Sequence, residues 1–321
     1  MTGTAAALAP AWLAAWCALS GIPMGAAALL LIHRLTGGDW GRDLAPVLRP
    51  AARAMPLLAL LFLPLLLDLP SLYPWAAGAA VPPDVAALWL NGPGFTLRAL
   101  AILALWSGLS WLATTPDLRP GAAAALLCLY AVTACMAGID WLMSRDPAFH
   151  STAFGAAFAS GQVLTGLAWA AAAAGGALAG PVRQDLARLL FGVLPAFAYL
   201  WFMQALVTWS GNLPEKSAWF ADRLAWPWQG VLLASVLAGL AAPLALLLTR
   251  RGRRSGPALR VAGALALAGM ALLSLWQVRP ELPAFGAVPV LLLLACAAAV
   301  AVAARRAGMR MPAARIAGGA G

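Results

Sequence analysis

The sequence predicts an all-α polytopic integral membrane protein with about nine transmembrane helices. Hydrophobic residues make up 63% of the 321 residues and charged residues only 10%. Apolar stretches of about 20 residues, long enough to cross a ~30 Å hydrocarbon layer, recur along the chain. Arginine-rich segments separate them at every second break. We therefore expect residues 1–321 to form one transmembrane domain and not a soluble fold with a single core.

The first apolar stretch ends at His33 and Arg34. Gly37 and Gly38 follow, and glycine commonly terminates helices. Asp39 is placed to cap a short interfacial helix that leads toward the second stretch.

The later spans follow the same rule of an apolar run bounded by charge, glycine or proline. The second is the shortest and contains Pro56 and Pro64, and a loop of a few residues, Thr114–Gly121, separates the third from the fourth. The nine predicted spans are Ala11–Ile32, Ala54–Leu69, Phe95–Ala113, Ala122–Ile139, Thr152–Leu178, Leu186–Ser210, Trp226–Thr249, Ala258–Gln277 and Phe285–Ala304.

The distribution of basic residues orients these spans, because cytoplasmic loops carry an excess of Lys and Arg. It predicts a multi-pass protein of the bacterial inner membrane with the N-terminus outside and the C-terminus in the cytoplasm. No cationic segment precedes the first span, so a cleavable signal peptide is not expected. The segments predicted inside hold Arg34, Arg42, Arg49, Arg53, Arg119, Arg183, Arg188, Arg250, Arg251, Arg253, Arg254, Arg260, Arg305, Arg306, Arg310 and Arg315, and those outside hold Arg98, Arg145, Lys216, Arg223 and Arg279.

The residue inventory argues against several classes of cofactor protein. The four cysteines form no CxxC pair, which disfavours c-type haem, iron–sulfur and zinc-ribbon sites. A haem b held inside a bundle needs two histidines at similar depth, whereas His33 and His150 are predicted on opposite sides of the membrane. No GxxxxGK[ST] sequence is present, and no basic, aromatic-rich soluble face suits nucleic acid. The chain is expected to bind no metal and no cofactor of its own.

Ionisable and polar groups within or beside the spans are the candidate functional residues, because such groups are costly in a bilayer. Solvated or paired loop charges and interhelical hydrogen bonds explain them as well as a proton path does. For quinol binding, Asp140 and His150 lie near span ends and could accept a hydroxyl proton. The candidates for the proton path are Asp68, Thr133, Asp140, His150, Gln162, Gln204 and Glu215.

Four segments resemble the ActF-type membrane subunit of alternative complex III, a quinol:cytochrome c oxidoreductase. This subunit belongs to the NrfD/polysulfide-reductase-type group of membrane anchors. The segments are HRLTGGDWG at His33–Gly41, LLALLFLPLLLDLPSLYPWA at Leu57–Ala76, IDWLMSRDPAFHSTAFG at Ile139–Gly155 and WSGNLPEKSAWFADRL at Trp209–Leu224.

The resemblance implies two four-helix bundles, here with one peripheral helix, and no redox centre on this chain. It implies a non-haem subunit of a quinol-oxidising respiratory complex that contributes helices and a proton path. Its partners would be other membrane subunits and subunits that bear haem or iron–sulfur clusters, with quinol at a subunit interface. The alternative is a stand-alone transporter or channel, although the sequence shows no convincing internal duplication, which transporters usually have.

Overall fold

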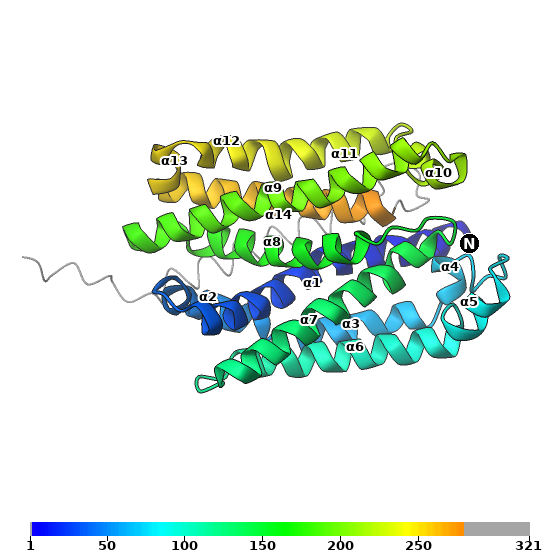
Figure 1. Ribbon diagram of the computed structural model, residues 1–321, viewed down its shortest axis with the longest axis horizontal. Coiled ribbons are helices and arrows are strands. Elements are labelled where there is room, and N and C mark those ends of the chain that lie inside the picture. Colours follow the sequence, from blue (N-terminus) through cyan, green and yellow to red (C-terminus); the bar gives the residue numbers. More distant parts are fainter. Residues whose placement is uncertain (1, 279–321) are drawn as a thin grey trace, which may run out of the picture.

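The computed structural model describes residues 2–278 and is helical over most of that range (Figure 1). Eight segments are long and apolar enough to cross a membrane. This confirms the prediction of an all-α polytopic membrane protein, and the ninth predicted span, Phe285–Ala304, lies outside the described residues. The helices are α1 (Thr2–Thr36), α2 (Trp40–Ala52), α3 (Met55–Leu66), α4 (Leu69–Leu72), α5 (Pro83–Leu88), α6 (Gly92–Ala113), α7 (Pro120–Trp141), η1 (Met143–Arg145), α8 (Phe154–Ala174), α9 (Gly180–Gly211), α10 (Pro214–Arg223), α11 (Trp228–Val236), η2 (Leu237–Ala241), α12 (Ala242–Leu248), α13 (Arg250–Arg254) and α14 (Gly256–Val278).

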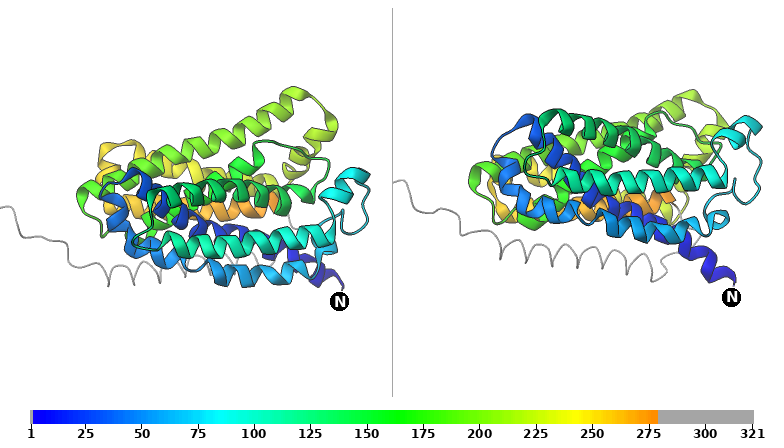
Figure 2. Two further views of the ribbon diagram at one scale, coloured as in Figure 1. Left: turned by 60° about the horizontal axis from the view of Figure 1, so that its bottom comes forward. Right: turned by 90° about the horizontal axis from the view of Figure 1, so that it is seen from below.

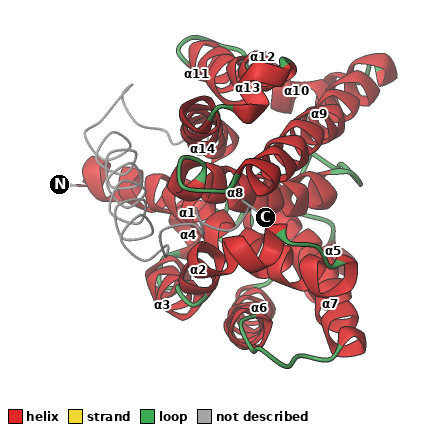
Figure 3. Cartoon of the chain, turned by 90° about the vertical axis from the view of Figure 1, so that its left-hand side faces the viewer, coloured by secondary structure: helices red, strands yellow, loops and turns green. Residues whose placement is uncertain are grey.

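The long helices form two groups of four spans. Helices α1, α3, α6 and α7 pack together, and so do α8, α9, α14 and the bent helix made of α11, η2 and α12. The two groups meet where α1 packs against α8 and α14 and where α7 packs against α8 (Figures 1 and 3). The first span of each group, α1 and α8, therefore lies at the centre, with 72% of its span buried in each case.

Glycine brings α1 and α8 into direct backbone contact. A Cβ added at Gly25 would lie 2.0 Å from the backbone oxygen of Gln162, and one added at Gly166 would lie 2.5 Å from the carbonyl carbon of Gly25. Small residues allow this approach in membranes, where van der Waals packing holds helices together. The central seam is therefore set by two glycines that face each other.

The two ends of the bundle differ in charge. In Figure 1 the left-hand end carries α2, α13 and the loop between α6 and α7, and the right-hand end carries the N-terminus, α4, α5 and α10. We call the first the arginine-rich end. Its basic residues are Arg34, Arg42, Arg49, Arg53, Arg119, Arg183, Arg188, Arg250, Arg251, Arg253, Arg254 and Arg260, whereas the described part of the opposite end has Arg98, Arg145, Lys216 and Arg223.

The segment between the first two spans forms the expected short helix, α2, at the arginine-rich end (Figure 2). Its buried face includes Leu44 and Leu48, while Arg42 is exposed, so the helix is amphipathic. Asp39 precedes the helix, but its side chain makes no capping hydrogen bond and instead pairs with Arg42. The capping role predicted for Asp39 is therefore wrong, because the arginine one turn later takes the carboxylate.

The seventh span is not a continuous α-helix. Five residues, Leu237–Ala241, form a π-helical turn between α11 and α12. Opposite this turn Gly239 faces Gly269 of α14, where an added Cβ would lie 2.1 Å from the Gly239 Cα. The hydroxyl of Ser235 donates to the backbone oxygen of Gly269 at 2.8 Å. The irregular turn thus coincides with a close contact between two backbones.

Candidate functional site

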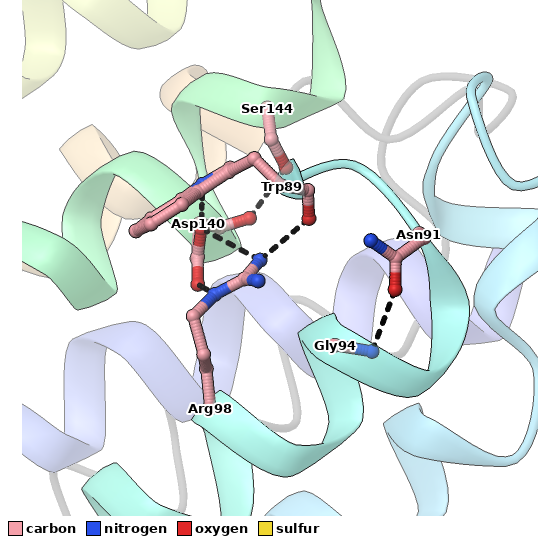
Figure 4. A network of polar contacts seen from close by, with 6 residues as sticks. All are labelled: Trp89, Asn91, Gly94, Arg98, Asp140 and Ser144. Atoms are coloured by element: carbon pink, nitrogen blue, oxygen red, sulfur yellow. Dashed lines mark hydrogen bonds and ion pairs between the residues drawn. The ribbon is translucent and has the colours of Figure 1, made fainter. Parts of the chain in front are cut away.

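The buried carboxylate of Asp140 lies near the end of α7, at the end opposite the arginine-rich one (Figure 4). Only 1% of its side chain is exposed, and Arg98 of α6 pairs with it through Nε to Oδ2 at 2.7 Å. The indole nitrogen of Trp89 donates to Oδ1 at 2.6 Å. Because both carboxylate oxygens accept charge-assisted or indole hydrogen bonds, Asp140 is a structurally satisfied charge.

Trp89 and Arg98 also bind each other. The Arg98 guanidinium carbon lies 4.1 Å from the centre of the Trp89 ring, and Nη2 donates to the Trp89 backbone oxygen at 2.9 Å. The side chain of Asn91 accepts from the backbone nitrogen of Gly94 at 2.8 Å and so caps the start of α6. The segment before α6 is thereby fixed over the Asp140–Arg98 pair (Figure 4).

Tyr73 connects this pair to a second region at the same end. Its hydroxyl donates to the backbone oxygen of Trp141 at 3.1 Å, and its ring is 1% exposed. Burial raises the pKa of Tyr73 above its ordinary value; Arg145 opposes that shift, and Cys17 and Asp140 add to it. Tyr73 therefore stays neutral at physiological pH and acts as a hydrogen-bond donor between the two regions.

A cavity of about 660 Å³ opens beside Tyr73, and we call it the end cavity. Residues from both four-span groups line it, and the charged ones are two arginines and two aspartates. Its lining residues are Pro10, Pro70, Ser71, Leu72, Tyr73, Pro74, Arg145, Asp146, Pro147, Asp222, Arg223 and Val278.

The two arginines of the end cavity both bind the last described turn of α14. Nε of Arg223 donates to the backbone oxygen of Gln277 at 3.3 Å, and Arg145 donates to that of Val278. Arg223 also lies over the Trp219 ring, at 4.0 Å from its centre. Through these contacts the two arginines hold the α14 wall of the cavity in place.

The structure distributes the predicted proton-path residues over several places. Thr133 is buried and accepts from the indole nitrogen of Trp106 at 3.0 Å, and Gln204 accepts from the hydroxyl of Ser151 at 2.8 Å. Asp68 and His150 are exposed at the same end as Asp140. The Asp140 carboxylate binds Arg98 and Trp89, whereas Arg145 donates to the backbone oxygen of Leu72 and a ring nitrogen of His150 lies 3.1 Å from the backbone oxygen of Ala148.

Two further candidates stand apart. Gln162 is buried in the middle of α8, away from the Asp140 pair. Glu215 falls in α10, and its side chain lies outside the described part of the structure. His33, near the end of α1, and His150 lie at opposite ends of the bundle. Among the described residues, no group of three His, Cys, Asp or Glu side chains could hold a metal ion.

Several residues of this end escaped the sequence analysis. The sequence does not single out Trp89, Tyr73 or Asp222 as functional residues. Arg98 offered the one usable signal, since an arginine inside an apolar span needs a partner. Which carboxylate it binds depends on how α6 packs on α7.

Comparison with known proteins adds no assignment. No family model matches the chain, and no curated protein matches it.

Proposed function

We propose that this chain is a non-haem integral membrane subunit of a quinol-oxidising respiratory electron-transfer complex, and that the end cavity is where it meets an extramembrane partner. The observation that supports this is the convergence of three of the four segments that resemble the alternative complex III subunit. Tyr73 comes from Leu57–Ala76, Arg145 from Ile139–Gly155 and Arg223 from Trp209–Leu224, and all three line one cavity. A shared site would explain why three segments that are far apart in sequence all resemble the same subunit.

The chemistry of the end cavity suits a polar partner surface. It is lined by two positive side chains, Arg145 and Arg223, and two negative ones, Asp146 and Asp222. Such charges orient a complementary partner surface more than they increase its affinity. The haem- or iron–sulfur-bearing partner would carry the redox chemistry. Quinol would bind where this chain meets another membrane subunit. Asp140 is the buried carboxylate that would accept its hydroxyl proton.

The alternative, a stand-alone transporter or channel, draws support from the π-helical turn Leu237–Ala241. Such turns often occur at functional sites, and transporters place substrates at interrupted helices. The close Gly239–Gly269 contact leaves no space for a substrate at this turn. We therefore favour the subunit.

Purification of the tagged chain from its native membrane in a mild detergent tests the proposal. We expect haem-bearing and iron–sulfur-bearing subunits in fixed ratio to the chain, and quinol-dependent reduction of cytochrome c by the purified assembly. Recovery of the chain alone, with substrate-driven flux after reconstitution into vesicles, would favour the transporter.

We also propose that the arginine-rich end faces the cytoplasm, as the positive-inside rule requires. Two exposed aspartates serve as matched labelling sites: Asp84 at one end and Asp117 at the other. In a background lacking the natural cysteines, a membrane-impermeant maleimide should label Asp84→Cys in intact cells. Asp117→Cys should react only after permeabilisation. The opposite pattern would reverse the orientation.

A further inference from the structure

The amide side chain of Gln162 lies buried in the middle of the bundle. The residue is 3% exposed, and neither Oε1 nor Nε2 has a hydrogen-bond partner among the described residues. A buried primary amide that stays unbonded in a membrane is strongly disfavoured. Each such group in a native fold calls for an explanation, and an ordered water is the commonest one.

The side chain lines a small cavity of about 30 Å³. By the measure in which a water molecule needs ~10–15 Å³, this space holds about two waters. Other polar lining residues are Thr165 on α8 and Ser274 and Gln277 on α14. The hydroxyls of Thr165 and Ser274 already donate to Gly161 and Met270, which leaves their oxygens as acceptors.

The residues around this small cavity indicate from which end of the bundle it is reached. Gln277 lines it, and the backbone oxygen of Gln277 accepts from Arg223, which lines the end cavity. The next residue, Val278, lines the end cavity itself. Toward the other end, Gly25 lies against the backbone of Gln162 and closes the space between α1 and α8.

We propose that Gln162 holds ordered water in a membrane-embedded polar site that is reached from the end cavity and closed toward the arginine-rich end. The amide of Gln162, the hydroxyl oxygen of Ser274 and the amide of Gln277 supply the two to four polar partners that a buried water needs. The site holds water whether or not the chain belongs to a respiratory complex, so it does not rest on the proposed function.

Radiolytic hydroxyl labelling of the full chain in lipid nanodiscs, read out by mass spectrometry, tests for bound water. Met270 lines the cavity and is half-buried, and Met24, a fully buried methionine on α1, gives the background oxidation of an inaccessible methionine. We expect Met270 to be oxidised well above Met24 in the natural chain. In Gln162→Leu, which replaces the amide by an apolar side chain of similar size, oxidation of Met270 should fall clearly below its level in the natural chain, while oxidation of Met24 stays unchanged.

Equal oxidation of Met270 and Met24 in the natural chain would overturn the proposal, as would unchanged labelling of Met270 in Gln162→Leu. If Gln162→Leu does not fold, Gln162→Met repeats the test. The side of access is measured with Ag⁺, a small thiol-reactive ion, at Cys17, which also lines the cavity. In a background with Cys17 as the one cysteine, Ag⁺ should protect it from later alkylation when added at the end-cavity face. Protection from the opposite face would contradict the route.

Discussion

Replacing Arg98 by leucine is expected to destabilise the fold by about 3–5 kcal/mol, the usual result of leaving one member of a buried ion pair without its partner. Asp140 is 1% exposed and receives two hydrogen bonds from Arg98, at 2.7 and 3.3 Å. Among the described residues, leucine would leave Trp89 as the remaining partner of that carboxylate. The melting temperature of the detergent-solubilised chain, followed by size-exclusion of a fluorescent fusion, measures the effect.

A double mutant separates pairing from packing. Asp140→Asn in the Arg98→Leu background should recover a large part of the lost stability, because the buried charge is gone. The matched control is the surface pair of Arg188 and Asp185, with side chains 64% and 45% exposed. Arg188→Leu should change stability by no more than about 1 kcal/mol. Equal effects of Arg98→Leu and Arg188→Leu would contradict the account of the pair.

Asp140→Asn by itself distinguishes a proton role from a structural one. If Asp140 takes part in coupled proton movement, turnover per assembled complex should fall while assembly is retained. If the carboxylate only anchors Arg98 and Trp89, subunit abundance should fall and turnover per complex should stay constant.

Gly25→Val is expected to prevent the two groups of spans from assembling. An added Cβ would lie 2.0 Å from the Gln162 backbone oxygen and 2.7 Å from the Gly166 backbone nitrogen. Overpacking ordinarily costs about 1–3 kcal/mol when side chains can adjust, and here both obstacles are backbone atoms. We therefore expect a loss at or above the upper end of that range, seen as aggregation or loss of the folded peak in size-exclusion.

Gly108 and Gly192 are the matched controls for Gly25. Both lie within long helices, and an added Cβ at either position meets no atom within 4 Å. Gly108→Ala should stabilise the fold by up to about 1 kcal/mol, since alanine favours helix more than glycine does. A Gly25→Val chain that melts like Gly108→Ala would show that the α1–α8 contact is not as close as described.

The fold class could be predicted because hydropathy and arginine placement act locally along the chain. The predicted span limits lie close to the helix limits where a charge or proline marks the boundary. One example is the predicted start at Ala122, two residues after α7 begins at Pro120. They differ where tertiary packing decides: the predicted start at Leu186 misses the first turns of α9, which begins at Gly180. Those turns carry Arg183 and Asp185, so composition alone placed them outside the membrane.

The candidate site was predictable only in part. Asp140 was singled out because a carboxylate at a span end is rare in a bilayer. Its pairing with Arg98, 42 residues earlier, depends on how α6 packs on α7. The convergence of Tyr73, Arg145 and Arg223 on one cavity likewise needs the tertiary arrangement, and no periodicity in the sequence encodes it.

The most direct test of the proposed role is site-specific photo-crosslinking in native membranes. A photoreactive residue at Ser71, in the end cavity, is compared with one at Asp117, in the exposed loop between α6 and α7. The account predicts a crosslink from Ser71 to a haem- or iron–sulfur-bearing subunit and none to that subunit from Asp117. Crosslinks to such a subunit from Asp117 but not from Ser71, or the absence of any such subunit at both positions, would contradict it.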